Sequence, residues 1–180
     1  MELHQIDHKI SDLLIELNTI VNNLEFEELA TFNLKNANQV IPWETLNYKG
    51  IYFFEVKTDE TNDNFKNWFR SFEKLWNDNK FIKKKTPKII QSRVSKHSGF
   101  KEWIPLYIGK SRKVGNRIDA HLNKEMDKST YALKLLARNN LKNYTFRVKA
   151  MKIDVNNYDT ILPEIESTLR NRFYPIIGKQ

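Results

Sequence analysis

The chain has 180 residues, is 40% hydrophobic, contains no cysteine and carries a formal net charge of +8. This length and apolar content predict one domain with a substantial core, and the lack of cysteine excludes disulfides, thiolate metal sites and a cysteine nucleophile. The N-terminus lacks the basic segment and apolar block of a signal peptide, and no stretch approaches the roughly 18 apolar residues of a membrane span. We therefore expect a soluble cytoplasmic protein with no membrane partner.

The positive charge is concentrated in the middle of the chain. Residues 1–79 carry a net charge of −7, residues 80–117 carry +11 with Glu102 as their one acid, and residues 118–180 carry +4. A surface that only confers solubility usually mixes both signs, whereas a cluster of one sign attracts a polyanion. The distribution favours a nucleic-acid partner.

Residues 6–24 place apolar side chains three and four positions apart, in a nearly heptad pattern. This spacing predicts an amphipathic helix of about five turns. Such a helix usually packs on its own domain, and a contact in a homodimer is the alternative. Residues 25–43 indicate a shorter helix and a connection, so we expect residues 1–47 to form an N-terminal helical extension packed on the core.

Residues 49–57, KGIYFFEVK, combine β-branched and aromatic residues after a lysine and a glycine, which predicts a strand. A polar turn is expected over residues 58–64. Residues 64–79 then place six large side chains on one helical face, and such a stripe is far more often core than a ligand site. The six are Phe65, Trp68, Phe69, Phe72, Leu75 and Trp76.

Residues 80–103 are basic and irregular, with apolar residues interleaved. A solvated linker is the alternative, but a linker would not need those apolar side chains. We therefore predict that the segment 58–102, which is inserted between two strands, is a DNA-binding arm. The candidate nucleic-acid-binding residues in and just after it are Lys83, Lys84, Lys85, Lys88, Arg93, Lys96, Lys101, Arg112 and Lys113.

The rest of the chain predicts further strands and helices. Residues 105–109, PLYIG, indicate a strand that leads into a helix, and residues 129–140 suggest a short helix. Residues 143–153 alternate apolar and polar side chains, as a half-buried strand does. Residues 159–175 predict a helix with Pro163 in its first turn. This order of elements predicts an α+β domain with a small sheet.

Two places on these helices could carry chemistry. Arg117 and His121 are four residues apart and are therefore neighbours on one helical face. The arginine disfavours protonation of the imidazole, so we expect a neutral histidine beside a phosphate-binding cation; a surface arginine and a core-edge histidine are the alternative. On the last helix, Glu166 falls about 60° from the centre of the apolar arc and Glu164 about 140°. Glu166 therefore points inward and needs a partner, either a divalent cation or a buried base.

Two tripeptides, Gly50-Ile51-Tyr52 and Tyr107-Ile108-Gly109, resemble the two halves of the signature of the GIY-YIG nuclease superfamily. The sequence that follows the second, KSRKVGNRIDAHL, resembles the first helix of that family. In this resemblance Arg117 takes the place of the catalytic arginine, and His121 follows it by four residues.

The last helix extends the resemblance. In EIESTLRNRFYP, Glu166 precedes Pro175 by nine residues, as a glutamate precedes a proline in the metal-binding helix of the family. The order of strands and helices also agrees. The resemblance covers residues 48–57 and 103–178, a little under half of the chain.

The resemblance implies a fold and a chemistry. The fold is a three-stranded antiparallel sheet flanked by helices within a nuclease domain over residues 48–180. The chemistry is hydrolysis of phosphodiesters with one divalent ion, Mg²⁺ or Mn²⁺, held by Glu166. Arg117 would stabilise the charge that develops on the phosphate, and Lys110 would be a further phosphate contact.

Tyrosine chemistry completes the implied site. Tyr52 would act as the general base or orient the attacking water, and Tyr107 and His121 would complete the hydrogen-bonded network. A free phenol has a pKa of about 10, so the role of base requires that cationic neighbours such as Arg117 lower the pKa of Tyr52.

The chain departs from the family pattern in two places. Between Tyr52 and Tyr107 lie 54 residues, where members usually have a short connection. Gly178 stands where many members have an asparagine, so an accessory contact is either missing or supplied by another residue. Without a separate DNA-binding domain, the chain looks most like a restriction-type endonuclease that cuts double-stranded DNA. Cutting both strands with one site per chain favours a homodimer. The alternatives are a non-catalytic DNA-binding module and a structure-specific or RNA-directed nuclease.

Overall fold

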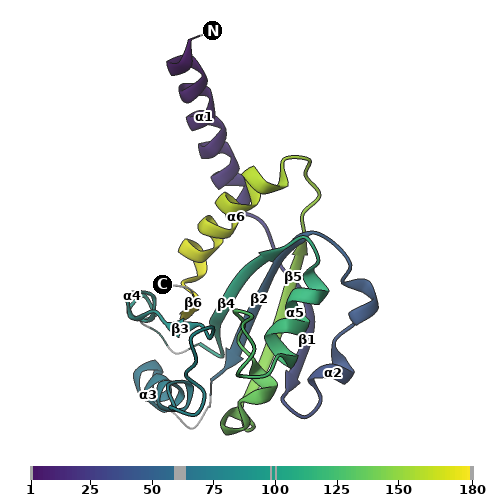
Figure 1. Cartoon of the computed structure of the whole chain (residues 1–180). Helices are drawn as coiled ribbons and strands as arrows, with labels where there is room; N and C mark the ends of the chain where they lie inside the picture. The colour runs from purple at the N-terminus through teal and green to yellow at the C-terminus, as the bar shows by residue number, and fades with distance from the viewer. Residues whose placement is uncertain (1, 59–63, 98, 100, 179–180) are drawn as a thin grey trace.

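The computed structural model describes residues 2–58, 64–97, 99 and 101–178. These residues form an α+β structure around an antiparallel sheet with strand order β1-β5-β2-β4 (Figure 1). Its strands are β1 (Glu27–Asn33), β2 (Gly50–Lys57), β4 (Trp103–Ser111) and β5 (Thr145–Lys152), and a second, two-stranded sheet consists of β3 (Lys88–Ile89) and β6 (Ile177–Gly178). The α-helices are α1 (Leu3–Asn22), α2 (Ala37–Val40), α3 (Phe65–Trp76), α4 (Gln91–Val94), α5 (Val114–Asn123) and α6 (Tyr158–Phe173), with short 3-10 turns η1 (Trp43–Thr45), η2 (Leu135–Ala137) and η3 (Asn139–Leu141).

The main sheet has four strands and not three, because residues 25–43, predicted as a shorter helix and a connection, contain β1 as well as the short helix α2. For β1 that prediction was wrong for a physical reason: Ala30 and Phe32 are buried while Thr31 and Asn33 are exposed, which is the two-residue period of a strand. Phe32 stacks on Phe146 of β5 with ring centroids 5.9 Å apart. Residues before position 48 therefore contribute to the sheet as well as to helices.

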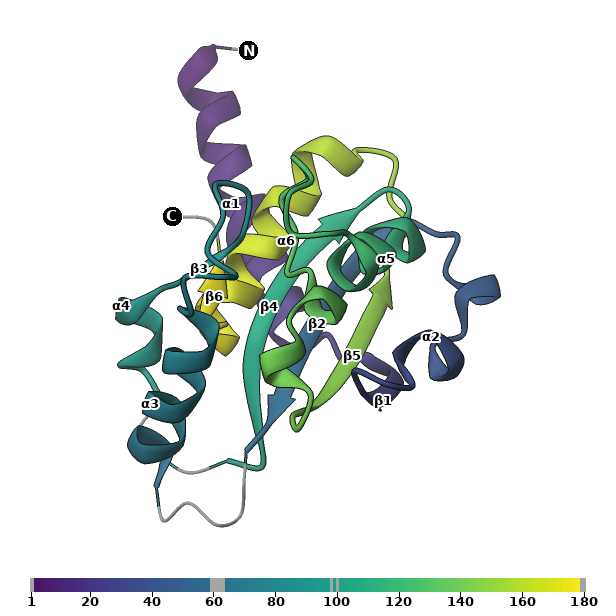
Figure 2. The same cartoon turned by 60° about the horizontal axis from the view of Figure 1, so that its bottom comes forward.

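The central strand β2 is buried on both faces, and each face packs against a different helix. Tyr52 and Phe54 belong to one core cluster with the buried side of α5, whereas Ile51 and Phe53 belong to another with the buried side of α6. Figures 1 and 2 show α5 and α6 on opposite sides of the strands β2 and β4. Because β4 is the edge strand next to β2, α5 and α6 cover the two faces of the sheet beside that edge.

The inserted segment 58–102 packs on the body of the domain. The aromatic face of α3 is core, as predicted: Phe65, Trp68, Phe69, Phe72 and Trp76 are all buried. The polar residues after α3 lead into β3, which pairs with β6 near the C-terminus, and then into α4. The predicted irregular arm therefore has local structure and is attached at both ends. Most of the turn expected over residues 58–64 lies outside the described residues.

Two helices differ from the prediction. Residues 129–140 do not form an α-helix; they contain η2 and the beginning of η3, and Lys134, immediately before η2, has a positive φ of 57°. Helix α6 begins at Tyr158, so Pro163 lies in its second turn and not in its first. Among the described residues, none of the helices combines the length and the apolarity that crossing a membrane requires.

Candidate active site

The pairing of β2 with β4 brings the two tripeptides together. Tyr52 lies opposite Gly109 in the register, and the Tyr52 hydroxyl lies directly over that glycine. A Cβ atom at Gly109 would come within 2.2 Å of the Tyr52 oxygen and 3.0 Å of the Tyr107 ring. Gly50 is equally confined, because a Cβ there would come within 2.1 Å of the Met151 carbonyl oxygen of β5. Neighbouring atoms therefore leave no space for a side chain at Gly50 or Gly109.

Tyr52 and His121 share a buried hydrogen bond. The Tyr52 oxygen lies 3.0 Å from Nε2 of His121, and Nδ1 of His121 accepts the backbone N–H of Leu133 at 3.0 Å. Because Nδ1 accepts, the proton of the neutral imidazole is on Nε2 and is donated to Tyr52. Burial lowers the pKa of His121 well below its ordinary range, and the charge of Arg117 lowers it further. The expectation of a neutral histidine is therefore confirmed.

Arg117 is the second donor to the same phenol. Its Nε donates to the Tyr52 oxygen at 3.3 Å, and its NH2 group donates to the carbonyl oxygen of Tyr131 at 2.5 Å. Burial lowers the pKa of Arg117, but the oxygens of Tyr52 and Tyr107 together outweigh burial and leave the pKa raised. Arg117 is therefore a permanently charged group, half-buried and oriented from two sides.

The pKa of Tyr52 is raised and not lowered, contrary to the expectation. Its side chain is 1% exposed; burial raises its pKa most, and the neighbouring hydroxyl of Tyr107 adds to this. The charge and the hydrogen bond of Arg117 act in the opposite direction and do not compensate. The Tyr107 ring is nearly parallel to that of Tyr52, with centroids 6.2 Å apart. Two donors to its oxygen nevertheless leave the proton of Tyr52 available for donation elsewhere.

Glu166 points inward, as predicted, and Glu164 is exposed. The two carboxylate oxygens of Glu166 accept hydrogen bonds from two basic side chains: Lys110 Nζ donates at 2.9 Å and Arg170 NH2 at 2.7 Å. The sequence left open whether the partner of Glu166 is a divalent metal ion or a buried base. In this structure its partners are the basic side chains of Lys110 and Arg170. Lys110 comes from β4 and Arg170 from the next turn of α6, so the ion pair joins the helix to the edge strand.

The chemistry of Glu166 fits a magnesium-type ion when substrate is bound. Such ions prefer oxygen ligands, retain several waters and are often held by one or two carboxylates together with substrate phosphates. In the part of the chain that the structure describes, no group of three or more histidine, cysteine, aspartate or glutamate side chains is placed to hold a metal. Glu166 would thus hold an ion only in company with phosphate oxygens and water, and with Lys110 displaced.

The predicted nucleic-acid-binding residues are in three situations. Most are exposed: Lys83, Lys84, Lys85, Lys88, Lys96, Lys101 and Lys113. Arg112 is exposed but forms an ion pair with Asp159 at 2.6 Å. Arg93 is half-buried and donates to the carbonyl of Pro175 at 3.4 Å; burial lowers its pKa, and the charge of Arg170 lowers it further. Arg93 therefore connects the inserted segment with the basic residues around Glu166.

Sequence reasoning missed the loop that orients the cluster. The carbonyl of Tyr131 accepts from Arg117, while the amide of Leu133 donates to His121. The Tyr131 hydroxyl donates to the carbonyl of Gly178 at 2.7 Å. Backbone groups of an irregular loop leave no residue pattern, so no sequence signal could have identified them. Arg170 could have been found, because it lies four residues after Glu166 on one helical face.

A buried arginine holds this loop against the inserted segment. Arg138 is 1% exposed and donates to three carbonyl oxygens, those of Leu133 at 3.1 Å, Trp76 at 3.1 Å and Phe81 at 3.3 Å. Its guanidinium also lies 3.8 Å from the centre of the Trp76 ring. Burial lowers the pKa of Arg138 to about 10, so it is still charged at neutral pH. The insertion thus supports the loop that orients His121.

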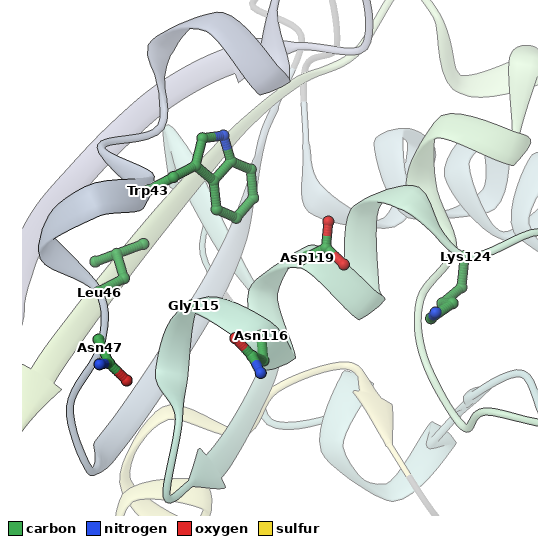
Figure 3. Close-up of a pocket in the computed structure, with 7 residues that line it drawn as sticks. All are labelled: Trp43, Leu46, Asn47, Gly115, Asn116, Asp119 and Lys124. Atoms are coloured by element: carbon green, nitrogen blue, oxygen red, sulfur yellow. The ribbon is translucent and has the colours of Figure 1, made fainter.

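Helix α5 also borders a separate cavity of about 570 Å³ (Figure 3). Trp43, Leu46 and Asn47 lie on one side of it, and Asn116, Asp119 and Lys124 on the other. It includes none of the predicted site residues. The face of α5 that carries Arg117 and His121 is therefore distinct from the face that borders this cavity.

Comparison with known proteins adds no relative: no family model, curated protein or solved structure matches this chain.

Proposed function

We propose that this protein is a divalent-metal-dependent endonuclease of the GIY-YIG type, and of the restriction type within it, that hydrolyses phosphodiester bonds of double-stranded DNA. The observation that carries the proposal is the convergence on the Tyr52 oxygen of two donors, Arg117 Nε at 3.3 Å and His121 Nε2 at 3.0 Å. Glu166 is joined to the neighbouring strand β4 through Lys110, which follows Gly109 on that strand and donates to the carboxylate at 2.9 Å.

Each side chain has a role that its contacts support. The Tyr52 oxygen, held by two donors, would orient the attacking water and accept its proton when the phenolate forms. Both donors favour the phenolate, whereas burial opposes it, so the phenolate fraction limits this step at neutral pH. Arg117 would stabilise charge on the phosphate oxygens, and a preorganised cation is effective there because it needs no reorganisation.

Glu166 and Lys110 would separate when nucleic acid binds. A divalent ion held at Glu166 would neutralise charge on the scissile phosphate. Lys110, released from the 2.9 Å ion pair, would then be free to contact a phosphate as a point charge. Arg170 would remain beside the carboxylate and keep it oriented.

The exposed lysines of the inserted segment support a polyanionic substrate. Lys83, Lys84 and Lys85 follow one another on the surface, and the Lys85 carbonyl accepts the amide of Ala132 at 3.4 Å. Phosphates bound by these lysines would therefore lie near the loop that orients Arg117 and His121. Binding through phosphates weakens steeply with salt.

Cleavage of supercoiled plasmid in the presence of Mg²⁺ tests the proposal. Glu166→Ala is expected to abolish nicking and linearisation while leaving the mobility shift of DNA in place. Glu164→Ala, two residues away and exposed, is the matched control and should cleave normally. Cleavage by Glu166→Ala at the rate of the unmodified protein would show that Glu166 does not hold the ion.

One observation favours a second candidate. Both oxygens of Glu166 are occupied by basic partners, as they would be in a non-catalytic DNA-binding module on the same fold. Such a module would shift the mobility of the plasmid at every Mg²⁺ or Mn²⁺ concentration without nicking the plasmid.

Parallel reactions with unmodified duplex, branched DNA and single-stranded RNA separate the double-strand endonuclease from a structure-specific or RNA-directed nuclease.

A further inference from the structure

Helix α1 exposes an unusual amount of apolar surface. Most of the large exposed hydrophobic side chains among the described residues belong to it, and their exposure ranges from 37% at Leu14 to 82% at Leu3. They are Leu3, Ile6, Ile10, Leu13, Leu14, Ile15 and Ile20. Figures 1 and 2 both show α1 projecting beyond the rest of the molecule, with only its C-terminal part beside α6. All of them except Ile15 fall on one face of the helix, and a contiguous apolar patch of this kind marks an interaction surface.

The exposed stripe continues a contact that the molecule already makes. Val21 is buried and Leu17 half-buried in the core cluster that contains the apolar side of α6. Toward the N-terminus the same stripe runs past the start of α6. There it borders a cavity of about 450 Å³, walled by α1 on one side and by Asn157, Thr160, Ile161 and Glu164 on the other. The N-terminal part of α1 therefore has the apolar stripe of a packed helix, and this stripe is exposed among the residues that the structure describes.

The spacing of the apolar residues on α1 indicates what kind of partner packs on this face. Leu3, Ile10 and Leu17 recur every seven residues, and Ile6, Leu13 and Ile20 recur between them. This is the a and d pattern of helices that pack on helices of the same kind. With fewer than three heptads, α1 is too short for a stable coiled coil by itself, so a partner helix must also use the wall that α6 provides.

Charge argues against the other classes of partner. The polar side of α1 carries three acids, Asp7, Asp12 and Glu16, against one lysine. Helices that bind membranes at the surface are rich in lysine and arginine, and a DNA-binding surface is positive. Neither anionic lipid nor DNA matches this helix.

We propose that α1 is the dimerisation element of this protein. In the pair, the N-terminal half of each α1 lies in the α1–α6 groove of a second copy, antiparallel and related by a two-fold axis. A self-complementary contact of this type closes after two subunits. A stable interface needs about 800 Å² from each partner. The six large exposed side chains on this face, together with the groove, contribute the apolar part of such an interface.

A dimer would bring two copies of the candidate active site onto one assembly. This consequence for double-strand cleavage rests on the proposed nuclease function, whereas the dimer itself does not. The oligomeric state can be measured without any activity, so failure of one proposal is distinguishable from failure of the other.

Light scattering after size exclusion tests the dimer. The full chain is expected to have twice the mass of one 21.5 kDa chain. The double variant Ile10→Glu/Leu13→Glu should shift to the mass of one chain with unchanged circular dichroism. Val40→Glu, which replaces a side chain of 41% exposure on α2, is the matched control and should stay dimeric.

A monomeric full chain, or a dimer that the double variant leaves intact, would overturn the proposal. Co-sedimentation of the full chain with anionic vesicles, lost in the double variant, would also overturn it.

Cross-linking tests the antiparallel arrangement, since the chain has no cysteine of its own. With Ile10 facing Leu13 of the second copy, Ile6 faces Leu17 of the second copy. The double variant Ile6→Cys/Leu17→Cys should therefore form intermolecular disulfides, because two cysteines can be joined only when their Cα atoms are closer than about 7 Å. Ile6→Cys alone should not cross-link. Cross-linking of Ile6→Cys alone indicates a parallel pair, and a dimer in which the double variant does not cross-link excludes this register; either result contradicts the arrangement.

If the nuclease proposal also holds, Ile10→Glu/Leu13→Glu should convert linearisation of plasmid into nicking. A plasmid that the full chain leaves intact would count against the nuclease function and leave the dimer standing.

Discussion

The amide of Leu133 donates to Nδ1 of His121 at 3.0 Å, and this contact decides which imidazole nitrogen faces Tyr52. With Nδ1 occupied, the proton of the neutral ring is on Nε2, where it is donated to the phenol. The carbonyl of the same Leu133 accepts from the buried Arg138 at 3.1 Å. One loop residue thus links the inserted segment to the centre of the candidate site.

Replacing Arg138 should therefore affect both stability and the site. Arg138→Met leaves three carbonyl acceptors without their donor, and a buried unsatisfied group costs about 1–3 kcal/mol. We expect the free energy of unfolding, measured in urea, to fall by about 3 kcal/mol. In the folded fraction, the cleavage rate should fall while the affinity for DNA is retained, because the change acts through His121.

Arg112→Met is the control for Arg138→Met, since Arg112 is exposed and its ion pair with Asp159 is on the surface. It should change the free energy of unfolding by less than about 1 kcal/mol. Equal stability of the two variants would contradict the role assigned to Arg138.

Gly109→Ala should displace the Tyr52 ring. The new Cβ would stand 2.2 Å from the Tyr52 oxygen and 2.5 Å from the ring carbon that bears it, and the buried ring has no room to retreat. Overpacking of this kind costs about 1–3 kcal/mol, which thermal or urea unfolding can measure. Gly99→Ala is the matched control, because a Cβ there meets nothing within 4 Å.

Tyr52→Phe should remove the proton acceptor and leave the fold in place. If Tyr52 takes the proton of the attacking water, cleavage should fall by about 10²–10⁴-fold, with the DNA mobility shift unchanged. Tyr107→Phe removes a neighbouring hydroxyl while retaining the stacked ring, so a smaller loss is expected. Cleavage by Tyr52→Phe at the unmodified rate would exclude this role.

The buried histidine predicts how stability depends on pH. An unfolded histidine has a pKa of about 6.5, whereas burial and then Arg117 lower the pKa of His121 in the folded protein. The unfolded chain therefore binds more protons as pH falls below about 6.5, and the free energy of unfolding decreases by up to about 1.4 kcal/mol per pH unit. The decrease ends where the pH reaches the lowered pKa of the folded state.

Urea unfolding at about pH 7.5 and about pH 5.5 measures this effect. His97, whose pKa burial also lowers, contributes in the same direction. His121→Gln should remove the part due to His121 and show a weaker pH dependence than the unmodified protein. An identical dependence in both proteins would mean that His121 is not the group that titrates.

Several features of this protein follow from local sequence. The period of apolar residues predicts α1, the aromatic face of α3 and the strands around Tyr52, Tyr107 and Phe146, because each depends on which side of one element is buried. The inward direction of Glu166 follows from the same reasoning. The heptad pattern of α1 is likewise visible in the residues alone.

Other features depend on contacts between distant residues, and no local pattern encodes them. Segment 27–33 is a strand because β5 offers it an edge and Phe146 a ring to stack on. Glu166 has Lys110 as a partner because α6 packs along β4, whereas its other partner, Arg170, is a neighbour on the same helix.

The raised pKa of Tyr52 also depends on contacts between residues that are distant in the sequence. Cationic neighbours could be inferred from the chain, but the loss of water around the phenol comes from the packing of β2, α5 and Tyr107, and that loss outweighs the charges. The sequence by itself determined which residues were available for chemistry. The tertiary structure decided their partners, burial and protonation, since these depend on the surroundings that folding creates.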